Sequence, residues 1–142
     1  MALFTPATNI TTGISTPTVT LVGGAGNTVP QYTTLTCHWS RTGNLVTAIF
    51  YAGGDGGNEG AGTGTINFSL PITASASSVT FLYGHGLMTN GATYSILYPY
   101  VTPSGTTAQL AYMSSISALA SVSGAMQNNT TREIQFTLIY EV

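Results

Sequence analysis

The chain has 142 residues, a length that fits one domain with a single hydrophobic core. Charged residues make up only 4 % of it, against about 25 % in an average soluble domain, and lysine is absent. Two arginines cannot neutralise a phosphate backbone or an anionic lipid surface, so the composition excludes nucleic acid and membrane as partners.

The remaining composition favours an assembled protein. Hydrophobic residues make up 43 % of the chain, while a free monomer usually keeps charges for solubility. We therefore expect a surface that is largely covered by partners. The first residues lack the basic and apolar regions of a signal peptide, and we expect none. Cys37 is the single cysteine, so it forms no disulfide within the chain, and we expect a buried, inert thiol.

Residues 1–16 are predicted to form an extended N-terminal arm. Thr, Pro, Asn and Gly alternate there with four apolar side chains, and neither a period of 2 nor one of 3.6 persists. A segment of this kind becomes ordered when it lies across a neighbour. The four apolar side chains are therefore predicted interface residues: Leu3, Phe4, Ile10 and Ile14.

From Pro17 to the end, residues 17–142 read as one β domain. About eight short strands are separated by turn residues, which is typical of an all-β, antiparallel β-sandwich of the jelly-roll type. The segment 114–125 fits either a bulged strand or a short helix. The predicted strands cover residues 18–22, 32–41, 45–52, 65–70, 79–83, 94–101, 108–113 and 133–142.

The strand predicted at 32–41 places Leu35, Cys37 and Trp39 on one face. Trp39 is expected to anchor the core. The alternative is an aromatic platform for a sugar ring. A glycan surface of this kind would also use several tyrosines, which equally suit a protein interface: Tyr83, Tyr94, Tyr98 and Tyr100.

The strand predicted at 45–52 is apolar on both faces, with Val46, Ala48 and Phe50 on one and three further apolar residues on the other. We therefore expect it to be covered on both sides, the second cover being a sheet, a loop or a neighbouring subunit. The absence of lysine also leaves edge strands unguarded, which again favours subunit contacts. The second face adds three predicted interface residues: Leu45, Ile49 and Tyr51.

The glycine-rich loop 53–64 carries Asp55 and Glu59, two of the four acids. Glycosidase chemistry needs two rigidly held carboxylates, which such a loop is poorly suited to provide. A calcium site that also uses Asn58 is a second alternative, because carboxylate and amide oxygens suit this ion. We favour a solvated loop that contacts a neighbour, with both acids as interface residues.

No other motif predicts chemistry. His38 is expected in the middle of a strand, and His85 lies in a Gly-His-Gly sequence that is predicted to be a turn, so the two do not form a pair. The glycine runs lack the Lys of a phosphate loop, and no serine has the surroundings of a nucleophile. We therefore predict no enzyme activity, no catalytic residue, no cofactor and no metal site.

The residues from 27 to 71 resemble a module of phage tail-fibre and head-associated structural proteins. The shared pattern is an aromatic strand with Trp39 and Arg41, the Gly43-Asn44 turn, an "LVT" strand, a Gly-x-Gly spacer at 62–64 and the "I-x-F-x-LP" strand at 66–71. The end of the chain, 128–142, is more loosely similar to the closing strand of such modules.

The resemblance implies a β-sandwich protein of the bacteriophage virion that forms a homotrimer. The chain has no shaft, coiled coil or collagen-like repeat, and with its size and arm this favours a capsid decoration (cement) protein. Such a protein would bind the major capsid protein or other virion proteins on the outer capsid surface and stabilise it. The alternative is a tail-fibre or tail-tip module that binds host surface polysaccharide.

Overall fold

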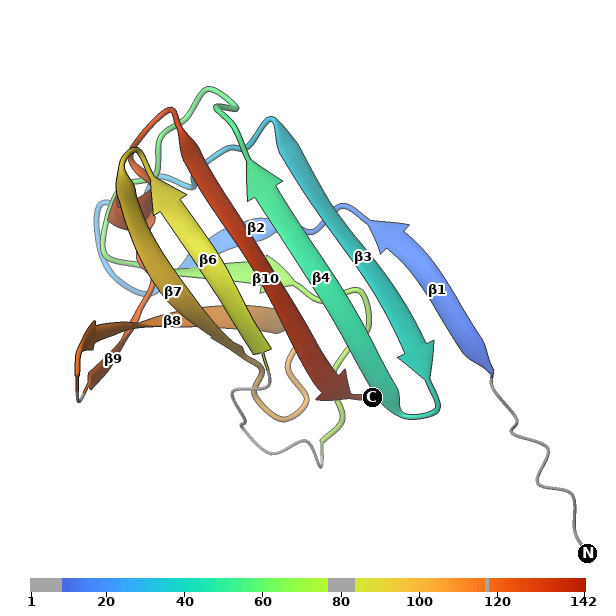
Figure 1. Cartoon of the computed structure of the whole chain (residues 1–142). Coiled ribbons are helices and arrows are strands. Elements are labelled where there is room, and N and C mark those ends of the chain that lie inside the picture. Colours follow the sequence, from blue (N-terminus) through green and yellow to red (C-terminus); the bar gives the residue numbers. More distant parts are fainter. Residues whose placement is uncertain (1–8, 77–83, 117) are drawn as a thin grey trace, which may run out of the picture.

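The computed structural model of the chain describes residues 9–76, 84–116 and 118–142 (Figure 1). Within these ranges, no helix has the length and hydropathy that a membrane span needs. The described elements are ten strands and a short 3-10 helix: β1 (Ile10–Ser15), β2 (Val19–Val22), β3 (Thr34–Thr42), β4 (Leu45–Gly53), β5 (Thr65–Ser69), β6 (Gly84–Asn90), β7 (Thr93–Tyr100), β8 (Thr107–Ser115), β9 (Ala118–Ser121), η1 (Gly124–Gln127) and β10 (Arg132–Glu141).

All the strands belong to one antiparallel sheet, in the order β1-β3-β4-β10-β6-β7-β8-β5-β2, with β9 paired to β8. The sheet curls, so that the first six strands form a front layer and β8, β5 and β2 lie behind it (Figure 1). The prediction of an all-β antiparallel fold is therefore confirmed. The two separate sheets of a sandwich are replaced by a half-barrel, because β7 continues into β8 by direct pairing.

Three phenylalanine rings hold the two layers together. Phe50 of β4 and Phe136 of β10 are stacked, with ring centroids 4.5 Å apart. Phe68 of β5 meets both edge-on, at 6.1 Å from Phe50 and 5.4 Å from Phe136. Edge-to-face contacts at these distances are favourable beyond the burial of apolar area. The back layer is thus fixed on the middle of the front layer.

Strict alternation places the core on one face of each front strand. Val46, Ala48 and Phe50 of β4 are fully buried. The alternate residues of β10 from Ile134 to Tyr140 are buried as well. Leu35 and Trp39 of β3 are partly buried and packed against this core, as predicted for an anchor. The other face of each front strand therefore points away from the molecule.

The N-terminal region differs from the predicted arm. Residues Ile10–Ser15 form β1, which pairs over its whole length with β3, from Ile10 opposite Thr42 to Ser15 opposite Cys37. This strand was not predicted because its sequence lacks an apolar periodicity. One face of β1 is exposed and the other carries Gly13, so the strand contains few apolar residues. Of the predicted arm residues, Leu3 and Phe4 lie outside the described residues, as does the strand predicted at 79–83.

Two further predictions are resolved by the structure. His85 does not lie in a turn; it belongs to β6, where the flanking glycines allow close packing against β10. A Cβ atom at Gly86 would meet the Phe136 Cβ at 2.5 Å, so only glycine fits there. The ambiguous segment 114–125 contains the end of β8, a bulge, β9 and the start of η1, and so combines both alternatives.

The buried Cys37 thiol makes stability depend on alkaline pH. Burial raises its pKa from 9.0 to about 11, and a hydrogen bond with the Ser15 side chain offsets part of this rise. Because the folded state holds the proton more tightly than the unfolded state, this residue lowers stability as pH rises from about 9 to about 11.

We therefore expect the free energy of unfolding to fall by about 2 kcal/mol through Cys37 over this pH window. Urea unfolding at pH 8, 9, 10 and 11 would measure the fall. The Cys37→Ala variant should show a smaller slope, and what remains should come from the buried hydroxyls of Tyr32 and Tyr140, whose pKa values are also raised by burial. Equal slopes in the two proteins would contradict the prediction.

Candidate functional site

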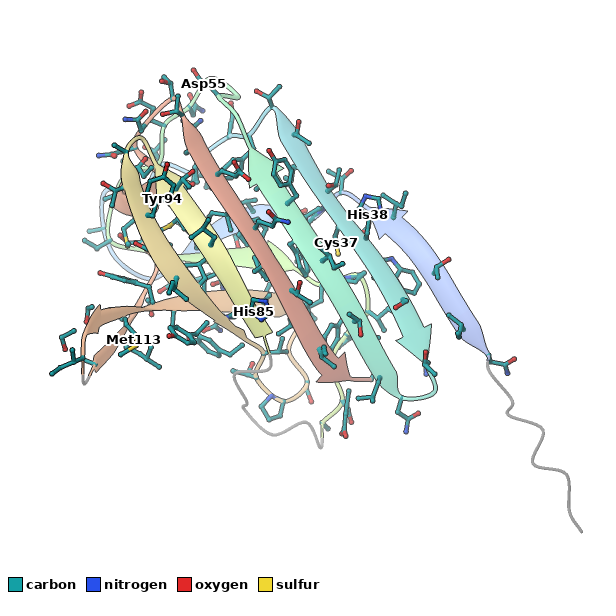
Figure 2. The ribbon with its side chains drawn as sticks, viewed as in Figure 1. Cys37, His38, Asp55, His85, Tyr94 and Met113 are labelled. Atoms are coloured by element: carbon teal, nitrogen blue, oxygen red, sulfur yellow. The ribbon has the colours of Figure 1, made fainter. Side chains whose placement is uncertain are left out.

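The exposed side of the front layer is the main candidate surface, and we call it the outer face. Antiparallel partners share a face, so the strand register defines its rows. One row runs from Ile14 to His38, Ile49, Thr137 and His85, across β1, β3, β4, β10 and β6. The outer face is therefore built from side chains that are far apart in the sequence. Figure 2 looks onto it, with His38 on β3 and His85 on β6 labelled.

The outer face is rich in exposed apolar side chains. Contiguous apolar areas of this kind mark interaction sites, because burial removes about 25 cal/mol of free energy for each Å². Five of its six strands contribute, and β3 instead presents threonine, serine and His38 there. Its large apolar residues, each between 43 and 70 % exposed, are Ile10, Ile14, Leu45, Ile49, Leu87, Tyr94, Ile96 and Ile139.

Charge is nearly absent from the outer face. Strand register and alternation place Glu133 and Glu141 there, at opposite ends of β10. Arg41 has the alternation of the inner face and donates its Nε–H to the Gly43 carbonyl oxygen at 2.8 Å. Among the described residues, the outer face thus has an uncharged centre and an acid at each end of its middle strand.

The strand predicted at 45–52 to be covered on both faces is β4, and the structure covers only one of its faces. Its inner residues are buried by the core, whereas Leu45 is 50 % and Ile49 is 46 % exposed, and Tyr51 is partly buried. No described segment of the chain covers this second face. Of the three covers considered from the sequence, a neighbouring subunit therefore remains.

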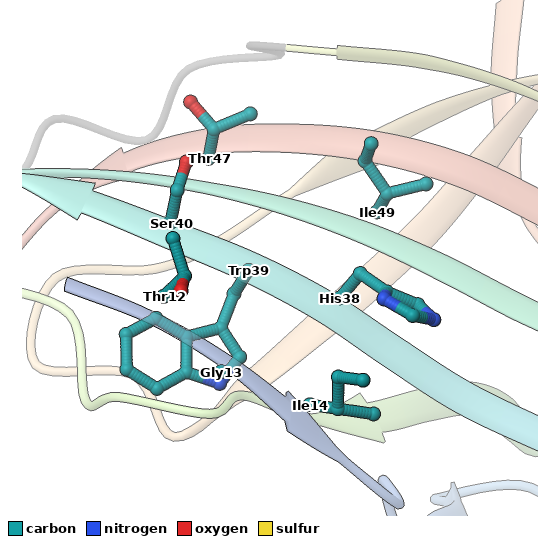
Figure 3. Close-up of a pocket in the computed structure, with 8 residues that line it drawn as sticks. All are labelled: Thr12, Gly13, Ile14, His38, Trp39, Ser40, Thr47 and Ile49. Atoms are coloured by element: carbon teal, nitrogen blue, oxygen red, sulfur yellow. The ribbon is translucent and has the colours of Figure 1, made fainter. Parts of the chain in front are cut away.

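A shallow groove crosses the outer face over β1, β3 and β4 (Figure 3). Its volume is about 420 Å³. A Cβ atom at Gly13 would lie 2.6 Å from the Trp39 ring, so the indole packs directly against the glycine backbone beneath β1. The groove is lined by Thr12, Gly13, Ile14, His38, Trp39, Ser40, Thr47 and Ile49.

A smaller hollow of about 260 Å³ lies between β6 and β10, beside His85 and Leu87. Next to it, register places Ile96 opposite Leu87 and Tyr94 opposite Thr89. We call Leu87, Tyr94 and Ile96 the β6–β7 patch. The outer face therefore has an apolar groove in one half and an apolar patch in the other.

The geometry disfavours metal or acid–base chemistry on the outer face. His38 and His85 stand three strand spacings apart, which is roughly 14 Å. Within the described ranges, no three His, Cys, Asp or Glu residues are grouped closely enough to hold a metal ion. The outer face thus offers apolar and neutral polar contacts.

The glycine-rich loop after β4 is anchored to the body of the protein by backbone bonds. The Gly56 amide donates to the Gln31 carbonyl, and the Gly60 amide donates to the Gln127 carbonyl. Thr28 and Ala61 exchange a pair of backbone hydrogen bonds. Asp55, at the end of the sheet in Figure 2, and Glu59 are exposed on this loop. The two acids are therefore displayed from a backbone that is held at several points.

Arg132 is the centre of this anchorage. Its side chain is fully buried and donates to the carbonyl oxygens of Gln31, Asn58 and Asn129. It also lies 3.3 Å from the Asp55 carboxylate. The Asp55 carboxylate accepts a further hydrogen bond from the Gly57 amide, so it already has protein partners.

Tyr32 completes the packing around this arginine. The Arg132 guanidinium lies 5.7 Å from the centre of the Tyr32 ring, within the range of a cation–π contact. The Tyr32 hydroxyl donates to Gln127 Oε1 at 3.1 Å. Burial raises the pKa of this hydroxyl well above its usual value, and the positive charge of Arg132 offsets part of that effect. Arg132 is therefore enclosed by backbone carbonyl oxygens, the Asp55 carboxylate and the Tyr32 ring, and its role is structural.

The predicted tyrosine surface is brought together in part. Alternation along β7 places Tyr94, Tyr98 and Tyr100 on one face, with Tyr94 the most exposed, at 68 %. The Tyr100 hydroxyl donates to Gln109 Oε1 and is therefore used within the molecule. Tyr83 lies outside the described residues.

A second, smaller apolar group lies on the hairpin of β8 and β9. Ile116 is 99 % exposed, Leu119 is 51 % exposed and Met113, marked in Figure 2, is 48 % exposed. The hairpin extends away from the front layer (Figure 1). It is separate from the outer face, so it offers comparison positions for substitutions.

Sequence reasoning missed three of the eight large apolar residues of the outer face. It selected Ile10, Ile14, Leu45, Ile49 and Tyr51, all of which the structure places on or beside that face. It did not select Leu87, because the region of β6 was interpreted as a turn, or Ile139, because β10 was interpreted as strictly amphipathic. Ile96 was also not selected, although it lies in the strand predicted at 94–101. Ile139 is the one apolar residue on the otherwise polar face of β10, and this exception in the sequence could have identified it as part of the surface.

Comparison of the chain with models of known protein families, with curated proteins and with solved structures finds no match in any of the three.

Removal of Arg132 should be strongly destabilising. In Arg132→Ala, three carbonyl oxygens and the Asp55 carboxylate each lose the arginine as a donor, and a fully buried side chain is replaced by a void, so we expect a loss of about 3 kcal/mol or more in the free energy of unfolding. Asp55→Asn should cost less than about 1 kcal/mol, because this carboxylate is 43 % exposed. Urea unfolding at pH 7 would measure both. Arg41→Ala serves as the matched control, and a loss there equal to that of Arg132→Ala would contradict the assignment.

Proposed function

We propose that this protein is a structural protein of a bacteriophage virion, and that it decorates the outer capsid surface as an oligomer and stabilises it. The outer face is the observation that carries the proposal. It combines eight exposed apolar residues with an uncharged centre. An uncovered surface of that kind is unfavourable in water, so a stable chain with this face belongs in an assembly.

The virion is inferred from the resemblance of residues 27–71 to modules of phage structural proteins. The strand pair β3–β4, joined at Gly43 and Asn44, contains the aromatic and "LVT" parts of that pattern. The resemblance also favours a homotrimer and a relation to jelly-roll sandwiches. The half-barrel is compatible with such a relation, because its two layers enclose one core.

A capsid position is proposed because the outer face is a broad and nearly uncharged surface. Decoration needs contacts with the major capsid protein that do not depend on charge, and the described surface has few charges to offer. The proposed mechanism is mechanical. Subunits joined through their apolar faces bridge neighbouring capsid proteins and oppose their separation.

The test is the addition of purified protein to phage particles that lack it. We expect the protein to co-sediment with these particles, to be distributed over the capsid in electron micrographs, and to raise the temperature at which particles release their DNA. Particles that already carry the protein are the control, because their sites are filled. Absence of binding, or labelling confined to the tail, would contradict capsid decoration.

The second candidate function is a tail module that binds host polysaccharide. Its specific support is the row of Tyr94, Tyr98 and Tyr100 on one face of β7, since aromatic rings stack on sugar rings.

A glycan array probed with the assembled protein separates the two functions. For a decoration protein, we expect wild-type and Tyr94→Ala proteins to give the same background signal. Binding of a capsular glycan that is lost in Tyr94→Ala would favour the tail module. Circular dichroism of both proteins would show that the substitution leaves the fold unchanged.

A further inference from the structure

We infer that the outer face is covered by other copies of this same chain, with the β6–β7 patch of one copy lying over the groove of another. The groove is the surface over β1, β3 and β4 that includes Ile14 and Ile49. This inference deepens the proposed function, because it names what covers the outer face in the assembly.

The size of the outer face matches a subunit contact. Its six strands are six to ten residues long. With strands about 4.8 Å apart and about 3.4 Å per residue, the face measures roughly 800 Å². A stable interface buries about 800 Å² on each partner. The outer face is therefore large enough to hold a second copy, and much larger than a small ligand requires.

The charge distribution favours a self-contact. Interface centres are depleted of charged residues, and charges lie at the rim. Glu133 and Glu141 stand at the two ends of β10, so both remain at the margin when the centre is covered. A strongly charged partner would find no counter-charge at this centre. A second outer face, itself neutral and apolar, fits it without burying a charge.

The two halves of the outer face are complementary. The groove of about 420 Å³ occupies β1, β3 and β4. The β6–β7 patch lies on the far side of β10, so the groove and the patch occupy opposite halves of the six-stranded front layer. Either a two-fold face-to-face contact or a closed ring can therefore bring the patch of one copy against the groove of the next.

The test is a charge swap between Ile14 on β1 and Ile96 on β7. These residues are 70 % and 62 % exposed and stand five strand spacings apart, so they cannot contact each other within one chain. We expect the wild-type protein to have a mass that is a multiple of 14.7 kDa by light scattering. Ile14→Lys and Ile96→Glu should each weaken association about 30-fold or more, because each places a single charge in an apolar contact.

The double variant Ile14→Lys/Ile96→Glu should recover association, because the lysine of one copy meets the glutamate of another. Leu119→Glu on β9 is the matched control, since Leu119 is 51 % exposed but lies off the outer face, and it should keep the wild-type mass. Circular dichroism and Trp39 fluorescence would establish that every variant is folded.

Three results would overturn the inference: a monomeric wild type at tens of micromolar, single variants with wild-type mass, or a double variant as dissociated as the singles. Each of these concerns the protein free in solution. Failure of the proposed function appears separately, as absence of binding to phage particles. A wild-type protein that forms oligomers but does not bind particles would retain the inference and reject capsid decoration.

Discussion

The contact of Phe68 with the stacked pair Phe50 and Phe136 is the interaction on which the rest of the structure depends. It joins β5 in the back layer to β4 and β10, the two central strands of the front layer. Because the curled sheet forms only a half-barrel, this cluster decides which face of every front strand is buried. The opposite face is left without a cover from the described chain, and the apolar residues on it become available to other molecules.

Arg132 is a second constraint, and it acts on loops. A buried guanidinium needs several acceptors, and here it finds them in the carbonyl oxygens of segments that are about 75 to 100 residues distant in sequence. One side chain thus fixes the end of the molecule where β3, β4 and β10 meet the glycine-rich loop. The outer face and this loop are therefore held by separate interactions, an aromatic cluster for one and an arginine for the other.

Much of the fold could be predicted from alternation, because strands with one buried face show it directly. β3, β4, β7, β8 and β10 were located in this way, and the Gly43-Asn44 turn between β3 and β4 was identified from its residue types. β1 and β6 were not located as strands, since Gly13, Gly84 and Gly86 occupy inner positions where the pattern requires apolar side chains. Their fit depends on Trp39 and on β10, which are distant in sequence.

The candidate surface could be predicted only in part for the same reason. The apolar second face of β4 was visible as three residues in one strand. Its continuation to Leu87 and Ile96 depends on strand order, which brings β6 and β7 beside β10. The contact of Asp55 with Arg132 could not be predicted either. Arg132 is held by backbone carbonyl oxygens, which are present in every residue type and therefore leave no pattern in the sequence. Local pattern thus identified the strands, while the neighbours of each strand were set by packing.

The way Arg132 holds the glycine-rich loop has a consequence for sequence variation. Two of its acceptors, at Gln31 and Asn58, are backbone carbonyls, which every amino acid possesses. The loop can therefore change the outward side chains at many of its positions while its path stays the same, as long as the arginine and the close-packed glycines are kept. Such a loop is suited to rapid divergence: its exposed chemistry, including the acid at Glu59, can drift between related chains without a cost in folding.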